Sequence, residues 1–465
     1  MSRRSLVSVV AVLGIVLGAC SSGASPTSSA PAASSAPAAS SAPAASAASQ
    51  APAASAASGA PAASAAALPS ARIAVWSGPE ADNLRKVAAE YTKETGNAIV
   101  IEEIARDGYS DKLKTAIVGG SADFDGVYLS ADWVPAFVAA GGLEPLDQFI
   151  NGADKASFLN LDNLQPGVSN LTVDGKIYGF PSEGDTAWLF YRTDLLSAAG
   201  IQPPTTMAEM LAAAQKLTTP DRYGLVIGNK IDEAWWDFMH YFWAFGGQLF
   251  DPTTYAVTVN NAAGVKALTF YSDLLRKYKV VSPDVTTYGY NEIMNALQQD
   301  KAAMGVEWMA ATKDLQDCTK SPKICDKIAY EFVPPDVAGQ YGFGGSSWGW
   351  SVPTASQNKL AGYKFIEWLV GGPGAKLWAL NGGIPSNTAA LTDPEVVAQV
   401  PQFKLLAEAM PYRHISPLLT TADQLINAMA DASTSAVTGA KTPQQAMDDA
   451  AVKITAALKE GGYLK

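Results

Sequence analysis

Strand-like and helix-like segments alternate along the chain from residue 71, and this order constrains the fold more than any other feature. The run ARIAVWSG (71–78) is rich in β-formers, and PEADNLRKVAAEYTKETG (79–96) follows with apolar residues at helical spacing. We expect further strands in NAIVIEEI (97–104) and DFDGVYLS (123–130), and a helix in ADWVPAFVAAGG (131–142). This β-α-β order predicts a parallel sheet covered by helices.

The alternation breaks where two strand-like runs, 176–180 and 187–192, meet without a helix between them. We expect this pair to carry the chain from one lobe to a second, because about 395 residues are more than one core normally organises. The runs KIAYEFVPP and SSWGWSVP are expected to carry it back. The prediction is an α/β clamp of two lobes, each a sheet flanked by helices, joined by hinge segments around a cleft. The expected N-terminal lobe is 71–181 with 334–370, and the C-terminal lobe is 182–333 with 371–465.

The second lobe is expected to contain a strand in RYGLVIG (222–228), another in AAMGVEW (302–308), and several helices. Thr206 with Glu209, and Thr442 with Gln445, have the spacing of capping boxes at two of these helices.

The amino end has the pattern of an export signal. Arg3 and Arg4 precede an apolar run, 6–17, which is too short for a stable membrane-spanning helix and has the length of a signal-peptide core. The following LGAC resembles the bacterial lipobox, so we expect 1–19 to be removed and Cys20 to carry lipid on the extracytoplasmic face of the cell membrane. An ordinary secretory signal with an unmodified cysteine is the alternative.

An Ala/Ser/Pro tract occupies residues 20–70 and repeats Ser-Ala-Pro-Ala-Ala at 29–33, 35–39 and 41–45. It has too few large apolar side chains to offset the entropy of folding, so we expect a disordered tether. A spacer across a cell wall is the related alternative.

Charge and cysteine content exclude some partners. The formal net charge of -11 argues against nucleic acid and anionic lipid as binding partners. Cys318 and Cys325, with six residues between them, are expected to form a disulfide outside the cytoplasm. Metal binding there is the weaker alternative, since neither His240 nor His414 is nearby in the sequence. We expect no metal and no cofactor.

Six segments, in the same order, resemble the extracytoplasmic solute-binding proteins of bacterial ABC importers, family 1, in the branch that binds sugars and polyols. They are YTKETGNAIVIEE, GGLEPLDQFI, DGKIYGFP, LFYRTDLLSAAGIQPPTTMAEMLAAAQKL, KAAMGVEW and GGPGAKLWALNGGIPSN. The resemblance implies a monomeric two-lobe binding protein, not an enzyme, that delivers its ligand to a membrane permease.

Sugars pack their C–H faces on aromatic rings and donate hydroxyl hydrogens to carboxylates, and the folded part has many tryptophans beside acidic residues. The resemblance implies that Trp308 stacks on the sugar and that Asp185 is a cleft carboxylate. Trp76 ends a strand, and Asp132 and Trp133 follow one. Trp348 begins a glycine-rich strand, and Trp236 lies on an aromatic helix. By contrast, Trp243, Trp368 and Trp378 are expected in the core. The expected ligand-binding residues are Trp308, Asp185, Asp132, Trp133, Trp76, Trp348 and Trp236.

Three other functions are compatible with parts of the sequence. Residues 345–349 match the G-x-S-x-G nucleophile pattern, but a proline-terminated extended run follows instead of the required helix, so no catalytic residue is expected. A surface glycosidase also uses tryptophans and paired carboxylates. Aromatic rings with acidic residues suit a polyamine or another cation equally well.

Overall fold

A computed structural model describes residues 68–106, 108–153, 155–164, 167–345 and 348–465. The expected signal peptide, Cys20 and the tether as far as residue 67 lie outside the described residues, as do the two serines of the G-x-S-x-G match. Among the helices within these ranges, none is long and apolar enough to cross a membrane.

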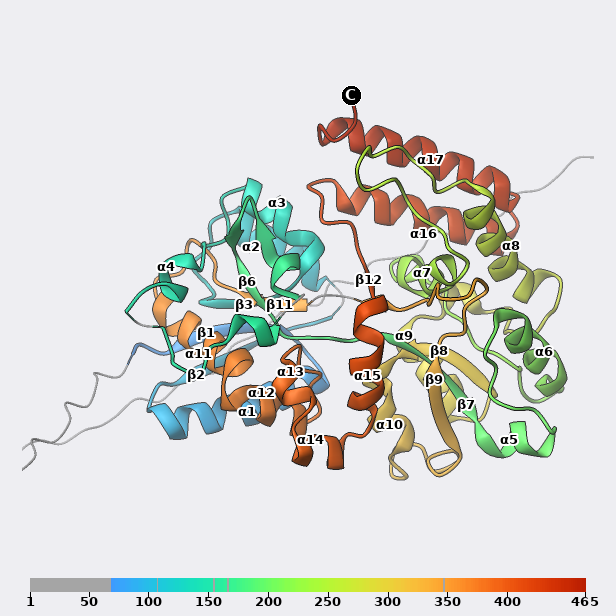
Figure 1. The fold of residues 1–465 in the computed structure, drawn as a ribbon, viewed down its shortest axis with the longest axis horizontal. Coiled ribbons are helices and arrows are strands. Elements are labelled where there is room, and N and C mark those ends of the chain that lie inside the picture. Colours follow the sequence, from blue (N-terminus) through green and yellow to red (C-terminus); the bar gives the residue numbers. More distant parts are fainter. Residues whose placement is uncertain (1–67, 107, 154, 165–166, 346–347) are drawn as a thin grey trace, which may run out of the picture. The chain divides into compact units, whose positions relative to one another are not determined.

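The first sheet has five strands in the order β2-β1-β3-β11-β6 (Figure 1). Strand β1 pairs in parallel with β2 and β3, as the β-α-β order predicts, and β11 is antiparallel to β3 and β6. Leu84, Val87, Ala88 and Tyr91 of α1 (Pro79–Thr95) are buried at helical spacing in the core beside this sheet. The strands are β1 (Ala71–Trp76), β2 (Ile99–Ile104), β3 (Gly126–Ser130), β6 (Gly179–Pro181) and β11 (Trp348–Ser351).

Most helical segments that pack on the first sheet begin shortly after one of its strands. Helix α1 ends at Gly96, whose φ of 76° is the left-handed conformation that glycine adopts without strain. The segments are α1 (Pro79–Thr95), α2 (Tyr109–Val118), the 3-10 turn η1 (Ala131–Trp133), α3 (Val134–Ala139), α4 (Asp147–Ile150), α11 (Lys359–Gly371) and α12 (Pro373–Leu380).

The second sheet has three antiparallel strands in the order β8-β7-β9. Its central strand is buried on both faces: Ala187, Leu189 and Tyr191 face one apolar core, whereas Trp188 and Phe190 face another. The strands are β7 (Ala187–Arg192), β8 (Met304–Trp308) and β9 (Ile328–Phe332).

Helices cover both faces of the second sheet. One core includes α6 (Met207–Leu217), α7 (Ala234–Ala244), α8 (Ala262–Arg276), α16 (Ala422–Thr438) and α17 (Pro443–Glu460), and Figure 1 shows the last two side by side. The other core includes α9 (Tyr290–Gln298), α10 (Thr312–Gln316) and α15 (Gln402–Ala409). It extends to α13 (Thr388–Leu391) and α14 (Pro394–Gln399), which pack against α12 of the first sheet. Helix α5 (Thr193–Ala198) follows β7 directly.

Two of the passages of the chain between the sheets lie in the regions that the sequence indicates. Strand β6 belongs to the first sheet and β7 to the second, so residues 182–186 form one crossing. Strand β9 belongs to the second sheet and β11 to the first, so the return follows residue 332. Two short pairs complete the strands: β4 (Thr172–Val173) with β5 (Lys176–Ile177), and β10 (Gly344–Gly345) with β12 (His414–Ile415).

The predicted strand at 222–228 is wrong. This run makes only isolated bridges, including Tyr223 with Ala302 and Val226 with Gly305. Only these two residues of the run pair with the segment that contains β8, and the residues between them, Gly224 and Leu225, make no bridge to it. A continuous strand ladder therefore does not form.

The two expected helix caps differ in detail. At α17, Thr442 and Gln445 form the reciprocal capping box. At α6, Thr206 accepts the Glu209 N–H as expected, but the Glu209 carboxylate accepts from the preceding Thr205 instead of from Thr206.

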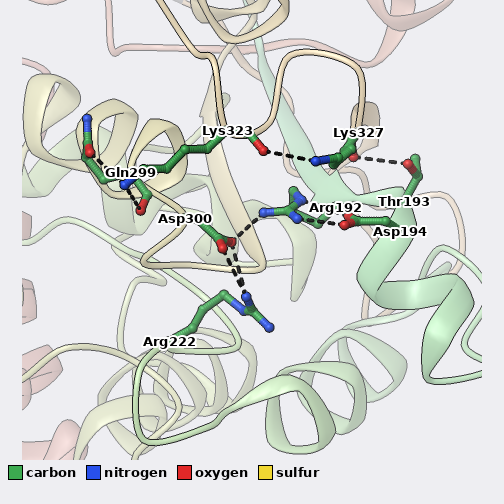
Figure 2. Close-up of polar contacts among 8 residues, drawn as sticks. All are labelled: Arg192, Thr193, Asp194, Arg222, Gln299, Asp300, Lys323 and Lys327. Atoms are coloured by element: carbon green, nitrogen blue, oxygen red, sulfur yellow. Dashed lines mark hydrogen bonds and ion pairs between the residues drawn. The ribbon is translucent and has the colours of Figure 1, made fainter.

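The Cys318–Cys325 disulfide is confirmed, and the loop it closes is attached to neighbouring elements (Figure 2). Lys323 of this loop donates to the backbone and side-chain oxygens of Gln299, just after α9. Lys327, just beyond the loop, donates to the Lys323 carbonyl and accepts from Thr193 after β7. These contacts fix the loop against the ends of α9 and β7.

A buried arginine lies beside this loop. The Arg192 side chain is 6 % exposed and pairs with both oxygens of Asp194 at 2.7 and 2.8 Å and with Asp300 (Figure 2). Arg222 pairs with the same Asp300 carboxylate at 3.2 Å. Asp300 has a φ of 59°, a left-handed conformation that aspartate tolerates better than most residues. Asp300 thus joins the end of α9 to two arginines.

Candidate functional site

One edge of the five-stranded sheet collects aromatic and charged side chains. Because β1, β2, β3 and β6 all point the same way, their carboxyl ends meet at this edge, which is where open α/β sheets bind ligands. The antiparallel β11 begins there. The residues that this geometry brings to the edge are Trp76, Arg106, Asp132, Trp133, Glu183 and Trp348.

Three indoles of this edge contact one another. The Trp348 ring centre lies 4.3 Å from that of Trp76 and 5.2 Å from that of Trp133, both nearly perpendicular. Trp76 is buried, whereas Trp133 and Trp348 are half-buried. The Arg106 guanidinium lies 5.3 Å from the Trp76 ring and 5.5 Å from the ring of Tyr290, which begins α9. Arg106 thus connects the edge of the first sheet to a helix packed on the second.

A second aromatic group lies where β8 ends. The Trp308 ring is 5.4 Å from Trp236 of α7 and 5.2 Å from His240, and both contacts are edge-on. Trp236 and Trp308 are half-buried, while the adjacent Trp235 is buried in the core. Since β7 and β8 are antiparallel with Ala187 opposite Trp308, the start of β7 and the end of β8 are neighbours. Asp185, two residues before β7, therefore lies near Trp308.

Buried carboxylates accompany these rings. The Tyr128 hydroxyl donates to Glu183 at 2.8 Å. Asp185 accepts the backbone N–H of Thr186 at 2.8 Å, and Glu307 accepts the backbone N–H of Trp308 at 2.7 Å. Burial raises the pKa of Glu183 to about 7, and it raises the pKa values of Asp185 and Glu307 well above their usual range. Neighbouring carboxylates raise all three pKa values further. At neutral pH Glu183 is therefore partly protonated.

A cavity of about 230 Å³ adjoins this region at Glu183 and Tyr290, and none of the seven expected ligand residues is in its wall. Its wall includes Glu80 of α1, Glu183 of the 182–186 crossing and Tyr290 of α9, so elements packed on both sheets contribute. Trp378 of α12 also lines it, although it is 5 % exposed and belongs to the core of the first sheet, as expected. Its indole N–H has no partner among the described residues.

Asp132 and Trp133 line a separate cavity of about 180 Å³. Burial raises the pKa of Asp132 to about 6, and a hydrogen bond from Ser130 partly opposes this increase in the pKa. Across the cavity, Lys114 of α2 pairs with Asp423 of α16 at 2.6 Å, a direct contact between helices that belong to different sheets. Trp133 also contacts Trp348, and so it belongs with the indoles at the edge of the five-stranded sheet.

The seven expected ligand residues therefore form two groups. Trp76, Trp348, Trp133 and Asp132 lie at the edge of the five-stranded sheet, whereas Trp308 and Trp236 lie at the end of the three-stranded one, and Asp185 lies on the crossing between the sheets. Their contact with a ligand remains a prediction. The expected lipidation of Cys20 falls outside the described residues.

Sequence reasoning missed several polar residues of this region. Glu183 is only two residues before Asp185 on the crossing, and Arg106 follows the end of a strand, so both had a positional signal. Tyr290 and Arg413 had none, because long stretches of chain separate them from the other site residues. The residues missed are Glu80, Arg106, Glu183, Tyr290 and Arg413.

Comparison with known proteins shows the family. The family model for bacterial extracellular solute-binding proteins matches residues 77–376. The chain belongs to this family. The solute-binding protein is thus a substrate-binding component of an ABC transporter and not an enzyme. The predicted two-lobe α/β clamp is also confirmed, since the structural relatives are clamps of this kind.

Several relatives cover most of the chain. A probable amino-acid ABC transporter periplasmic-binding protein of Sinorhizobium fredii is 27% identical over 84% of this chain and 89% of its own. The structure of maltose-bound MalE3 of T. maritima has a TM-score of 0.76, is 24% identical, and covers 83% of this chain and 99% of its own. A solute-binding protein of Agrobacterium radiobacter, in complex with ribitol, has a TM-score of 0.73, is 26% identical, and covers 83% and 98%.

Proposed function

We propose that this solute-binding protein captures a sugar, an oligosaccharide or a polyol between its two sheets and delivers it to the permease of an ABC importer. The observation that carries the proposal is the pairing of half-buried indoles with buried carboxylates on elements of both sheets. The likeness to structures that hold maltose and ribitol supports the same ligand class.

In this proposal each group has one task. Trp308 and Trp236 on one side, and Trp76, Trp133 and Trp348 on the other, pack against the C–H faces of the ligand. Asp185 and Asp132 accept its hydroxyl hydrogens. Contacts from both sides are made together only when the lobes close on the ligand, so binding favours the closed form that a permease recognises.

The proposal also includes how the protein is held at the cell surface. Cys20 carries the lipid, the Ala/Ser/Pro tract serves as a tether, and the folded part works as a monomer on the extracytoplasmic face. The sequence around Cys20 and the extracellular character of the family support this part.

A thermal-shift screen tests the ligand class. Purified protein is heated with single sugars, maltodextrins, polyols and their amine-bearing analogues, with amino acids and spermidine as the contrasting classes. We expect at least one sugar or polyol derivative to raise the melting temperature progressively with concentration, because a ligand that binds only the folded form stabilises it. Stabilisation by amino acids or spermidine alone would contradict the proposal.

A further inference from the structure

Two basic side chains near helix α2 reach elements that pack on the other sheet. The guanidinium of Arg106, in the segment between β2 and α2, lies 5.5 Å from the ring of Tyr290 in α9. Lys114 of α2 pairs with Asp423 of α16 at 2.6 Å. Helix α2 belongs to the core of the five-stranded sheet, whereas α9 and α16 belong to the cores of the three-stranded sheet. Contacts from this one part of the chain therefore cross from one lobe to the other.

Lys114 pairs across the lobes instead of within its own helix. Asp111 stands three residues before it on α2, a spacing at which opposite charges can pair along a helix. Among the described residues, however, the carboxylate within ion-pair distance of Lys114 is that of Asp423. Asp423 lies in the first turn of α16, where the helix dipole favours a negative charge. The pair thus joins helices whose paired residues are 309 positions apart in the chain.

An apolar contact accompanies the ion pair. Leu418 and Leu419 lie in the segment between β12 and α16. Leu418 packs against the core of the five-stranded sheet, whereas Leu419 is buried in a core of the three-stranded sheet. This segment therefore touches both lobes directly before the helix that carries Asp423, and it brings the start of α16 close to α2.

The ion pair borders two of the expected ligand residues. The Lys114 ammonium lies 5.8 Å from the centre of the Trp133 ring, within the range at which an indole attracts a cation. Trp133 and Asp132 line the cavity of about 180 Å³ together with Lys114 and Asp423. A movement that separates α2 from α16 therefore also opens the cavity beside Trp133.

We propose that Lys114 and Asp423 are positioning residues, whose ion pair holds α16 against α2 and keeps Trp133 and Asp132 facing the second lobe in the arrangement that binds ligand. The pair acts without touching the ligand. Its effect on affinity rests on the proposed function, whereas its effect on the contact between α2 and α16 requires no ligand.

Hydrogen–deuterium exchange without ligand tests the contact itself. We expect Lys114→Gln to speed exchange at residues 419–424 at least about twofold, and Asp423→Asn to do the same at residues 112–118, because each change releases the helix of the opposite lobe. Lys114→Arg keeps the charge and the hydrogen bond, so it is expected to exchange like the unmodified protein.

Calorimetry tests the effect on binding, with maltose, ribitol and any other sugar or polyol that the thermal-shift screen identifies. We expect Lys114→Gln and Asp423→Asn each to raise the dissociation constant about two- to fivefold, a small change because both side chains are partly exposed. The double variant is expected to bind no more weakly than the weaker single variant, since the second change removes no further contact. In about 0.5 M sodium chloride the differences are expected to vanish, because salt screens exposed charges.

A matched ion pair inside one lobe provides the control. Lys453 of α17 pairs with Asp431 of α16 at 2.6 Å, and these side chains are 54% and 52% exposed. Lys453→Gln therefore removes a similar pair from the same helix α16 but removes no contact between the lobes. We expect it to leave the affinity, and the exchange at residues 112–118 and 419–424, unchanged.

The outcomes separate this inference from the proposed function. Unchanged exchange in both neutral variants, or a double variant whose loss of affinity equals the product of the two single losses, would overturn the inference. The same change in exchange after Lys453→Gln would show a general loosening of α16 and would also overturn it. Failure of every sugar and polyol to bind would contradict the proposed function, while the exchange measurement would still decide this inference.

Discussion

Replacing Trp308 by alanine is expected to raise the dissociation constant of the ligand about 30-fold to 300-fold, or about 2–3.4 kcal/mol. Trp308 is half-buried at the end of β8, and its described ring contacts, Trp236 and His240, both meet it edge-on. No flat stacking partner is present among the described residues, so the ring is suited to stack on a sugar. The affinity is measured by calorimetry with the ligand found in the screen.

Two further variants make this result specific. Trp308→Phe keeps a smaller aromatic face and is expected to lose less affinity than the alanine variant. Trp368→Phe alters a core indole that is 3 % exposed and bonded to Glu94, so it is expected to change stability more than affinity. A folded Trp308→Ala protein with unchanged affinity would show that this ring has only a structural role.

Replacing Asp300 by alanine is expected to lower the free energy of unfolding by about 2–4 kcal/mol. The change removes the carboxylate that pairs with Arg192 and Arg222, and the Arg192 side chain is 6 % exposed. Arg192 keeps Asp194, so we expect less than the full cost of an unpaired buried charge. Alanine at a φ of 59° adds the strain of a left-handed backbone. Denaturant unfolding measures the loss.

Two further variants separate the effect of the lost ion pairs on the free energy of unfolding from the effect of backbone strain. Asp300→Gly removes the carboxylate but adopts positive φ freely, so it is expected to be more stable than the alanine variant by about 1 kcal/mol. Asp300→Asn keeps a side chain that tolerates this conformation and loses only the charge. A loss below about 0.5 kcal/mol in the alanine variant would show that the two ion pairs contribute little to stability.

The sequence predicted the architecture well wherever local pattern and tertiary packing agree. The alternation of strands and helices from residue 71 predicted the parallel pairing of β1 with its neighbours, and two strand-like runs without a helix between them marked the crossing before β7. The apolar run 222–228 was misjudged as a strand because it makes only isolated bridges, at Tyr223 and Val226, and composition does not reveal where pairing is interrupted.

The candidate site was only partly predictable, for a physical reason. Residues directly after a strand, such as Asp132, are found by counting along the chain, because the sheet fixes where strands end. Tyr290 reaches the cavity only through the packing of α9, and Arg413 lies near Asp185 only because α15 and β12 return to the crossing. Buried carboxylates such as Glu307 look like any other acid in the sequence, because their pKa depends on burial.

Hydrogen–deuterium exchange with and without the ligand tests the central claim, that one ligand contacts elements of both sheets, most directly. We predict slower exchange at residues 76–80 and 130–133 on one side, and at residues 233–237 and 307–309 on the other, at the same ligand concentration. Slower exchange on only one of the two sides, or at neither, would contradict the account.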